Sequence, residues 1–216
     1  MKENHKTTPK TLGKREITKQ VNRQQILDAA FELFCKQGFE ATNVRDIIRE
    51  SGLSAGTFYN YFQSKEEIFE ELKNNIIEDL RIAIRAARWR YNFALDKIVD
   101  SFKAFFQVLA DRPKLMLFLS RNQSYLRQLR SEGGLDVFLR DLEEDLQKAM
   151  DSGRLPPMPV HIVSLALFGT IFELVSEFVR NPQFSIEETS QALAKLFYGA
   201  FNRKWKDTKK SREKKN

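Results

Sequence analysis

Cysteine and histidine are scarce in this chain of 216 residues, which holds one cysteine and two histidines. A single thiol, Cys35, cannot form a disulfide within the chain, so the composition favours a reducing compartment. His5 and His161 lie far apart in the sequence, so neither a His/Cys metal set nor a Ser/His/Asp arrangement can be assembled from them. A glycine-rich phosphate loop is also missing from the sequence. We therefore expect no metal, no cofactor and no enzyme activity.

Long hydrophobic runs are also lacking. A membrane-spanning helix needs about 18 or more consecutive apolar residues, and the most apolar stretch here, residues 160–172, contains His161 and Thr170 and ends before Glu173. This pattern predicts a buried helix. Residues 1–6 lack the apolar middle of a secretory signal, so we expect a cytoplasmic protein without a membrane span.

The central part of the chain has no excess of positive charge, although the formal net charge is +7. The surplus lies at the two ends, residues 1–22 and 203–216, which are rich in Lys and Arg and poor in apolar residues. Such segments cannot bury a core, so both are predicted to be basic and disordered. For residues 1–22 the alternative is an arm that lies along DNA phosphates or in the minor groove. Bulk charge therefore gives no argument for DNA binding by the folded part.

Between these ends, apolar residues recur at intervals of three and four, and no strand-like alternation appears. The pattern predicts an all-α fold of about nine helices, with residues 115–129 forming one of them. Breaks between helices are predicted at Gly38, residues 51–54, Arg112–Pro113, Gly133–Gly134, residues 152–157 and Asn181–Pro182. Capping boxes, in which a Ser is followed three residues later by Glu, open the helices at Ser64 and Ser185.

Residues 42–62 carry a helix-turn-helix pattern. Val44, Ile47 and Ile48 form the apolar side of a first short helix, which has Thr42 or Asn43 as its cap, and residues 51–54 form a turn that contains glycine. In the second short helix, the apolar and aromatic side chains fall on one side, while small and polar residues face outward. An outward surface of this kind can approach a partner closely and form hydrogen bonds with it.

This stretch resembles the amino-terminal domain of the tetracycline-repressor (TetR) family of bacterial transcription regulators. The order and spacing of the following residues carry the resemblance: residues 26–30, Leu33–Phe34, Gly38–Phe39, Thr42, residues 51–54, residues 56–59, Phe62 and residues 64–67. The resemblance implies a three-helix helix-turn-helix DNA-binding domain followed by a helical ligand-binding and dimerisation domain. With the chain's own pattern, it divides the sequence into an arm (1–22), a DNA-binding domain (23–68), an effector-binding and dimerisation domain (69–202) and a tail (203–216).

The resemblance also implies roles for individual residues. Thr42, Thr57, Tyr59 and Lys65 would contact the DNA backbone, and Gly56 would allow close approach to the phosphates. Arg45, Ala55 and Asn60 would meet base edges, since Arg suits guanine and Asn suits adenine. The full predicted set is Thr42, Arg45, Ser54, Ala55, Gly56, Thr57, Tyr59, Asn60, Tyr61 and Lys65. Tyr61 stands where many members of the family have histidine. An alternative for Arg45 is that it pairs with a neighbouring acid.

For the carboxy-terminal half, the resemblance implies an effector pocket enclosed by helices and a homodimer formed by the last two helices. The aromatic content suits an apolar effector, although such stripes also occur in plain cores. The candidate pocket residues are Phe102, Phe106, Phe118, Asn122, Tyr125, Phe138, His161, Phe168, Phe172 and Glu173. The candidate interface residues are Leu167, Ile171, Leu174, Phe178, Leu193, Leu196, Phe197 and Ala200.

Two hypotheses of function follow. The first is an effector-responsive, sequence-specific regulator, most simply a dimeric repressor that a small apolar ligand releases from a palindromic double-stranded operator. The second is a helical protein-interaction module whose helix-turn-helix does not bind DNA. Neither the operator sequence nor the effector can be identified from these residues.

Overall fold

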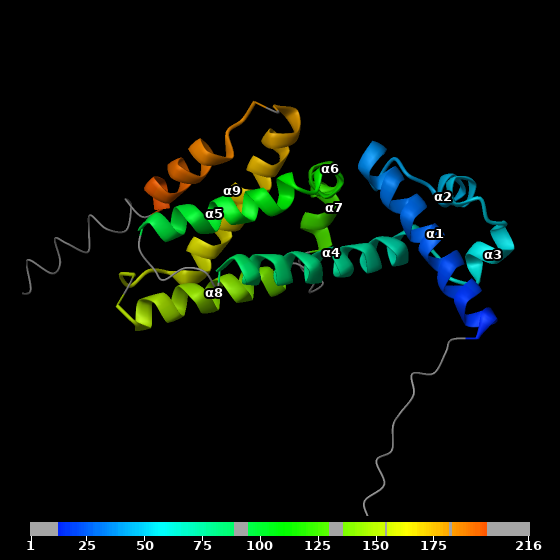
Figure 1. The fold of residues 1–216 in the computed structure, drawn as a ribbon, viewed down its shortest axis with the longest axis horizontal. Helices are drawn as coiled ribbons and strands as arrows, with labels where there is room; N and C mark the ends of the chain where they lie inside the picture. The colour runs from blue at the N-terminus through cyan, green and yellow to red at the C-terminus, as the bar shows by residue number, and fades with distance from the viewer. Residues whose placement is uncertain (1–12, 89–94, 130–135, 154, 182, 198–216) are drawn as a thin grey trace, which may run out of the picture.

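The computed structural model describes residues 13–88, 95–129, 136–153, 155–181 and 183–197, and within these ranges the chain is all-α, as predicted. The helices are α1 (Lys14–Gln37), α2 (Val44–Ser51), α3 (Ala55–Tyr59), α4 (Lys65–Arg88), α5 (Leu95–Ala110), α6 (Pro113–Arg121), α7 (Gln123–Gln128), α8 (Asp136–Asp151) and α9 (Val160–Arg180), followed by helical residues 186–197. Figure 1 shows α1, α2 and α3 gathered at one end as a head, from which α4 runs into a body made by the remaining helices.

The predicted boundary of the amino-terminal arm was wrong for residues 14–22, because α1 begins at Lys14. These residues are mostly good helix formers, and extending a helix that is already nucleated costs little per residue. Periodicity missed them because residues 13–21 are exposed and bury no apolar stripe. Residues 1–12 and the predicted tail, residues 203–216, lie outside the described residues.

The predicted single helix over residues 115–129 is two helices, which accounts for a tenth helix in the described ranges where about nine were expected. The break lies at Asn122, between α6 and α7. The Asn122 side chain donates to the Phe118 carbonyl oxygen at 2.7 Å, the same oxygen that its backbone N–H bonds. Asparagine favours such local side-chain bonds over continued helix, so the chain changes direction here.

The predicted turn and cap signals are confirmed by the backbone. Asn43 caps α2 and shares a capping box with Asp46, and Gly52 ends the helix with a φ of 69°. Ser64 accepts the N–H of Glu67 at 3.2 Å, and Ser185 accepts that of Glu188 at the same distance. Local side-chain chemistry thus sets where these helices begin, independently of the core.

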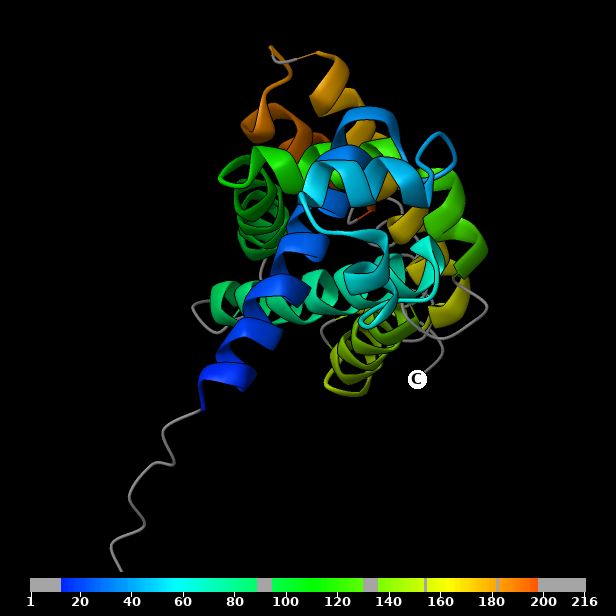
Figure 2. The same ribbon diagram turned by 90° about the vertical axis from the view of Figure 1, so that its right-hand side faces the viewer.

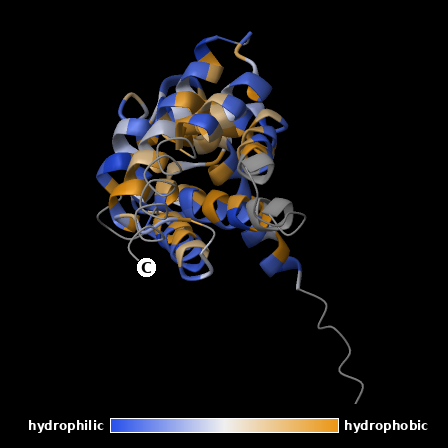
Figure 3. Cartoon of the chain, turned by 90° about the vertical axis from the view of Figure 1, so that its left-hand side faces the viewer, coloured by the Kyte–Doolittle hydropathy of each residue, from blue (hydrophilic) through white to orange (hydrophobic). Residues whose placement is uncertain are grey.

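The head and the body share one hydrophobic cluster. Phe34 of α1 lies 5.3 Å, between ring centroids, from Phe69 of α4, whose ring stacks on Phe118 of α6 at 5.2 Å. Tyr125 of α7 stacks on Phe39 in the loop after α1. The predicted domain boundary at residue 68 therefore crosses a continuous core. Figure 2 shows α4 running behind α1 from the head into the body. Figure 3, seen from the body end, shows the apolar and polar segments alternating along the helices.

Asn122 fastens this contact with hydrogen bonds. Its side chain is buried, accepts the N–H of Phe39 at 2.6 Å and donates to the carbonyl oxygen of Phe34 at 3.1 Å. Gly38, with a φ of 82°, lets the chains approach, because a Cβ there would lie 3.1 Å from the Arg121 carbonyl oxygen. Asn122 was predicted to line an effector pocket, and that prediction was wrong, because its polar atoms are used in joining α6 to the head.

Helix α9 is long and apolar enough to cross a membrane by length and composition, with a mean hydropathy of 1.9, although only a third of that window is buried within the chain. Core helices of soluble proteins can pass the same test. Val163, Leu167, Val175 and Phe178 of α9 are buried against other helices. In this structure, α9 packs against the other helices of the body along one side.

Replacing Asn122 with Leu should lower the free energy of unfolding by about 1–3 kcal/mol, because the buried N–H of Phe39 would lose its acceptor. Urea unfolding followed by circular dichroism measures the change. Asn74→Leu, on the exposed side of α4, is the matched control and should leave stability nearly unchanged. Equal effects of the two substitutions would contradict the role assigned to Asn122.

Candidate nucleic-acid interface

The α2–turn–α3 unit is held by a few buried side chains that leave its outer surface free. Ile47 of α2 and Phe58 of α3 are completely buried. Ser54 caps α3 by accepting the N–H of Thr57 at 3.1 Å. This cap fixes the start of α3 directly after the turn, and α3 lies at the outer end of the head (Figure 1). Its small and polar residues Ala55, Gly56 and Tyr59 are exposed.

Most residues of the predicted DNA-binding set lie together at this surface. Arg45 on α2 is exposed, and so are most of the candidates in and around α3, with two more half-buried beside them. The exposed ones around α3 are Ser54, Ala55, Gly56, Tyr59 and Asn60, and the half-buried ones are Thr57 and Tyr61. The arrangement offers hydroxyl, phenol and amide groups over one narrow face, which suits contacts to phosphates and base edges.

Arg45 is exposed on α2 and forms no ion pair among the described residues. The neighbouring acid, Asp46, instead pairs with Arg49 at 2.9 Å. The structure therefore does not contain the alternative arrangement, in which Arg45 pairs with a neighbouring acid. A free guanidinium beside α3 keeps its donors available for a base edge or a phosphate.

Thr42 and Lys65 are placed differently from the rest of the predicted set. The Thr42 side chain is buried and donates to the Gly38 carbonyl oxygen at 2.7 Å, so it does not present a hydroxyl to phosphate. Lys65, at the start of α4, donates to the carbonyl oxygens of Phe39 and Thr42, both at 2.8 Å. Its ammonium also lies 4.2 Å from the centre of the Phe39 ring. Both residues thus shape the loop that precedes α2.

Sequence reasoning missed the contacts that join α1 to this surface. Asn22 donates to the hydroxyl of Tyr61 at 3.3 Å. Arg23 pairs with Glu71 of α4 and lies 4.9 Å from the centre of the Phe62 ring. Asn22 and Arg23 fell inside or at the edge of the predicted arm, and their polar character gave no signal of burial.

The candidate pocket residues do not line one cavity. Phe118 is fully buried in the cluster shared by head and body, and Phe106 is fully buried in another cluster with Phe178 and Leu193. Phe102 packs on that second cluster. Half-buried Tyr125, Phe138, Phe168 and Phe172 all pack against the first cluster instead, and the rings of Phe168 and Phe172 are 4.7 Å apart.

The pocket candidates His161 and Glu173 are at the surface. The His161 side chain is 74% exposed and bonds Glu143 at 2.8 Å. That bond, together with one from Ser164, holds the pKa of Glu143 below its ordinary value. Glu173 lies among Arg127 and Arg180 in exposed ion pairs. The prediction that His161 and Glu173 are embedded in an apolar pocket was therefore wrong.

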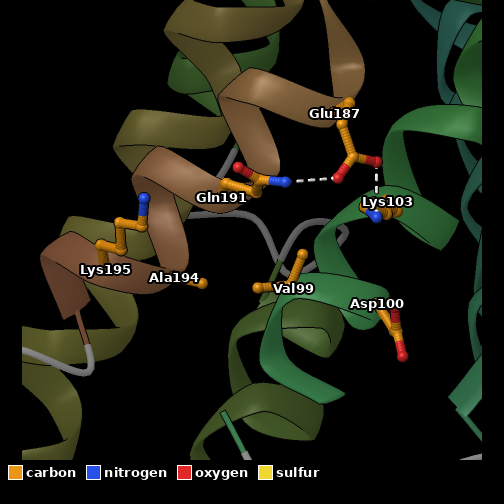
Figure 4. A pocket seen from close by; sticks show the side chains of 7 residues that line it. All are labelled: Val99, Asp100, Lys103, Glu187, Gln191, Ala194 and Lys195. Carbon is orange, nitrogen blue, oxygen red and sulfur yellow. Dashed lines mark hydrogen bonds and ion pairs between the residues drawn. The ribbon is translucent and has the colours of Figure 1, made fainter. Parts of the chain in front are cut away.

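A recess of about 310 Å³ lies between α5 and helical residues 186–197 (Figure 4). Its lining is largely charged, and Lys103 pairs across it with Glu187 at 2.5 Å. Gln191 also donates to Glu187. The recess does not coincide with any predicted pocket residue.

Metal binding and thiol chemistry find little support in the described part of the chain. No group of three His, Cys, Asp or Glu residues there could hold a metal ion. The thiol of Cys35 is buried and donates to the Lys114 carbonyl oxygen at 3.3 Å. Burial, and next the charge of Glu32, raise the pKa of Cys35 to about 12, so this thiol is protonated at neutral pH.

The predicted interface residues divide by burial. Leu167, Phe178 and Leu193 are buried within their own chain, so little of their surface is left for a partner. Leu196 is 62% exposed, and Ile162, which was not predicted, is 64% exposed on α9. Ile171, Leu174 and Phe197 are half-buried, and Ala200 lies outside the described residues.

Comparisons with known proteins agree with this geometry. A family model described as bacterial regulatory proteins, tetR family, matches residues 26–72. The uncharacterised HTH-type transcriptional regulator YfiR of Bacillus subtilis is 30% identical over 147 residues, which cover 65% of this chain and 71% of that protein. The fatty acid metabolism regulator protein of Bacillus subtilis is 28% identical over 190 residues, which cover 83% and 95% of the two chains.

Solved structures share most of this fold. The transcriptional regulator FadR from Bacillus subtilis, in complex with stearoyl-CoA, matches with a TM-score of 0.63 and 27% identity, covering 80% of this chain and 96% of that one. The fatty acid degradation regulator FadR from Bacillus halodurans matches with a TM-score of 0.68 and 22% identity, covering 87% and 96%. The likeness extends through the body helices as well as the head.

Replacing Arg45 with Ala should cost about 1–3 kcal/mol of binding free energy at one base position and relax specificity there, because Arg45 is free to bond a base edge. Affinities for a panel of DNA sites, each altered at one base pair, measure this. Tyr59→Phe is the comparison, and it should weaken binding to all sites equally, as removal of a phosphate-bonding group does. An unchanged specificity profile would remove Arg45 from the base-reading residues.

Proposed function

This chain belongs to the tetR family of bacterial regulatory proteins, and we propose that it is a repressor that a long-chain acyl-CoA releases from its operator. It is a ligand-responsive, DNA-binding regulator of transcription, as its relatives are. The observation that carries the choice of effector is the match to the stearoyl-CoA complex of Bacillus subtilis FadR, which covers 80% of this chain. We place the protein in the bacterial cytoplasm, where operators and acyl-CoA are both found.

The body offers surfaces that suit an acyl chain. Tyr125, Phe138, Phe168 and Phe172 come from α7, α8 and α9, are half-buried, and pack against the cluster that also holds the head. Partly exposed aromatic rings beside a core are what an aliphatic chain can cover. A ligand bound among them would contact the same cluster that positions α1 and α4.

The proposed DNA interface is formed by Arg45, Ser54, Ala55, Gly56, Thr57, Tyr59, Asn60 and Tyr61. In this proposal, Tyr59 and Thr57 bond phosphates, and Arg45 and Asn60 read bases. Lys65 and Thr42 act indirectly, because their bonds to the loop of residues 38–42 set the position of α2.

We further propose that two copies pair through α9 and helical residues 186–197. One helix-turn-helix buries too little surface for tight specific binding, whereas a two-fold dimer places two α3 helices in successive major grooves. The exposed Ile162 and Leu196 lie on these two elements, and α9 is more apolar than its burial within one chain requires. A self-complementary contact of this kind would form a four-helix interface.

Stearoyl-CoA at micromolar concentration should weaken binding of the operator about 5–150-fold, the usual range of coupling between two sites. Fluorescence anisotropy with DNA from upstream of the protein's own gene measures the effect, with free coenzyme A and stearate as controls. DNA binding that is insensitive to acyl-CoA would refute this choice of effector. Protein that binds no DNA at any salt concentration would instead favour a protein-interaction module.

Replacing Leu196 with Glu should convert the dimer into monomer at micromolar concentration and abolish tight operator binding, because a charge would be placed in an apolar contact. Sedimentation velocity gives the species present. Ile82→Glu is the matched control, since Ile82 is 59% exposed but lies on α4, and it should leave the dimer intact. A wild-type monomer, or a Leu196→Glu variant that stays dimeric, would refute this interface.

A further inference from the structure

The first two turns of α1 extend beyond the head without packing on it. Residues 13–21 are all exposed, including the apolar Ile17 and Val21, each 50% exposed. Among the described residues, the first of α1 with a polar side-chain contact to another element are Asn22, which bonds Tyr61, and Arg23, which pairs with Glu71. Residues 14–21 therefore project about 12 Å past the three-helix head, at 1.5 Å per residue. Figures 1 and 2 show this end of α1 extending beyond the other helices of the head.

The buried side of α1 becomes basic where the helix leaves the head. Steps of four and three residues back from buried Ile26 follow one side of the helix and reach Asn22, Lys19 and Arg15. Lys14 lies beside them, two steps of four before Asn22. Since Asn22 points at Tyr61, these three cations lie on the side of α1 that faces the edge of the candidate nucleic-acid interface.

The three cations are free to bind an outside partner. Lys14, Arg15 and Lys19 are exposed, and in the part of the chain that the structure describes none of them has an ion pair. Glu16, the single acid of these turns, does not neutralise them. A stable helix holds the three charges at fixed spacing, which a disordered arm would not do.

We propose that Lys14, Arg15 and Lys19 bind backbone phosphates of the DNA that flanks the operator. The inference rests on the proposed DNA-binding function and extends its interface outward from Tyr61. Phosphate is the fitting partner because the groups are unpaired cations on long stems, directly continuous with a surface suited to DNA. A reach of about 12 Å covers roughly three base pairs at 3.4 Å each, beyond those that α3 can contact.

The test compares the full chain with a triple variant, Lys14→Gln with Arg15→Gln and Lys19→Gln. The control is a second triple variant with the same loss of charge at exposed positions elsewhere, Lys36→Gln with Arg112→Gln and Arg140→Gln. Each protein is titrated with two DNA duplexes at several salt concentrations. One duplex holds the operator alone, and the other adds about six base pairs of unrelated sequence at each end.

On the long duplex, the first variant should make the slope of log K against log salt shallower by about 2.7 for each head, since each phosphate that a cation neutralises contributes about 0.9. On the short duplex it should bind as the wild type does, and the control variant should match the wild type on both. Thermal unfolding should coincide for all three proteins.

An unchanged salt slope on the long duplex would overturn the proposal. An equal reduction on both duplexes would overturn it too, since the charges would then act without flanking DNA. Wild-type protein that binds neither duplex would refute the proposed function itself, and this inference with it.

Discussion

The loop of residues 38–42 is held by hydrogen bonds from two sides, and the position of the head depends on these bonds. Asn122, at the break between α6 and α7, accepts the N–H of Phe39, while Lys65 of α4 donates to the carbonyl oxygens of Phe39 and Thr42. Gly38 permits the close approach to α6. Because the loop leads directly into α2, a displacement of α6 relative to α4 is imposed on the helix-turn-helix. A ligand that prefers one of the two arrangements can therefore change DNA affinity.

The head could be predicted from the sequence because its signals are local. Asn43, Gly52 and Ser54 act through their own backbone and near neighbours, so each appears in the sequence as it does in the structure. The start of α1 escaped prediction because its first turns bury nothing, and periodicity detects burial. Thr42 and Lys65 were predicted to contact the DNA backbone, whereas their side chains bond inward to the loop before α2, because spacing does not say whether a polar group turns inward or outward.

The body could be predicted as helices but not as a site. A polar residue in an apolar stretch, such as Asn122 or His161, gives the same sequence pattern whether it lines a pocket, joins two helices or faces solvent. Phe106 and Phe118 likewise belong to different clusters, although their stripes look alike. Which side of Phe178 or Leu193 meets a partner depends on packing between distant segments, and a single sequence does not report that packing.

The shared core has a consequence for synthesis on the ribosome. Phe34, Phe39 and Phe69 of the amino-terminal part share one buried cluster with Phe118 and Leu126, and the Phe118 ring packs on those of Phe34 and Phe69. Translation adds about 5–20 residues per second, so the partners from α6 and α7 arrive several seconds after the head has emerged. During that interval, aromatic surface of the head is open to water. The nascent head is thus a target for chaperones until the middle of the body has been made.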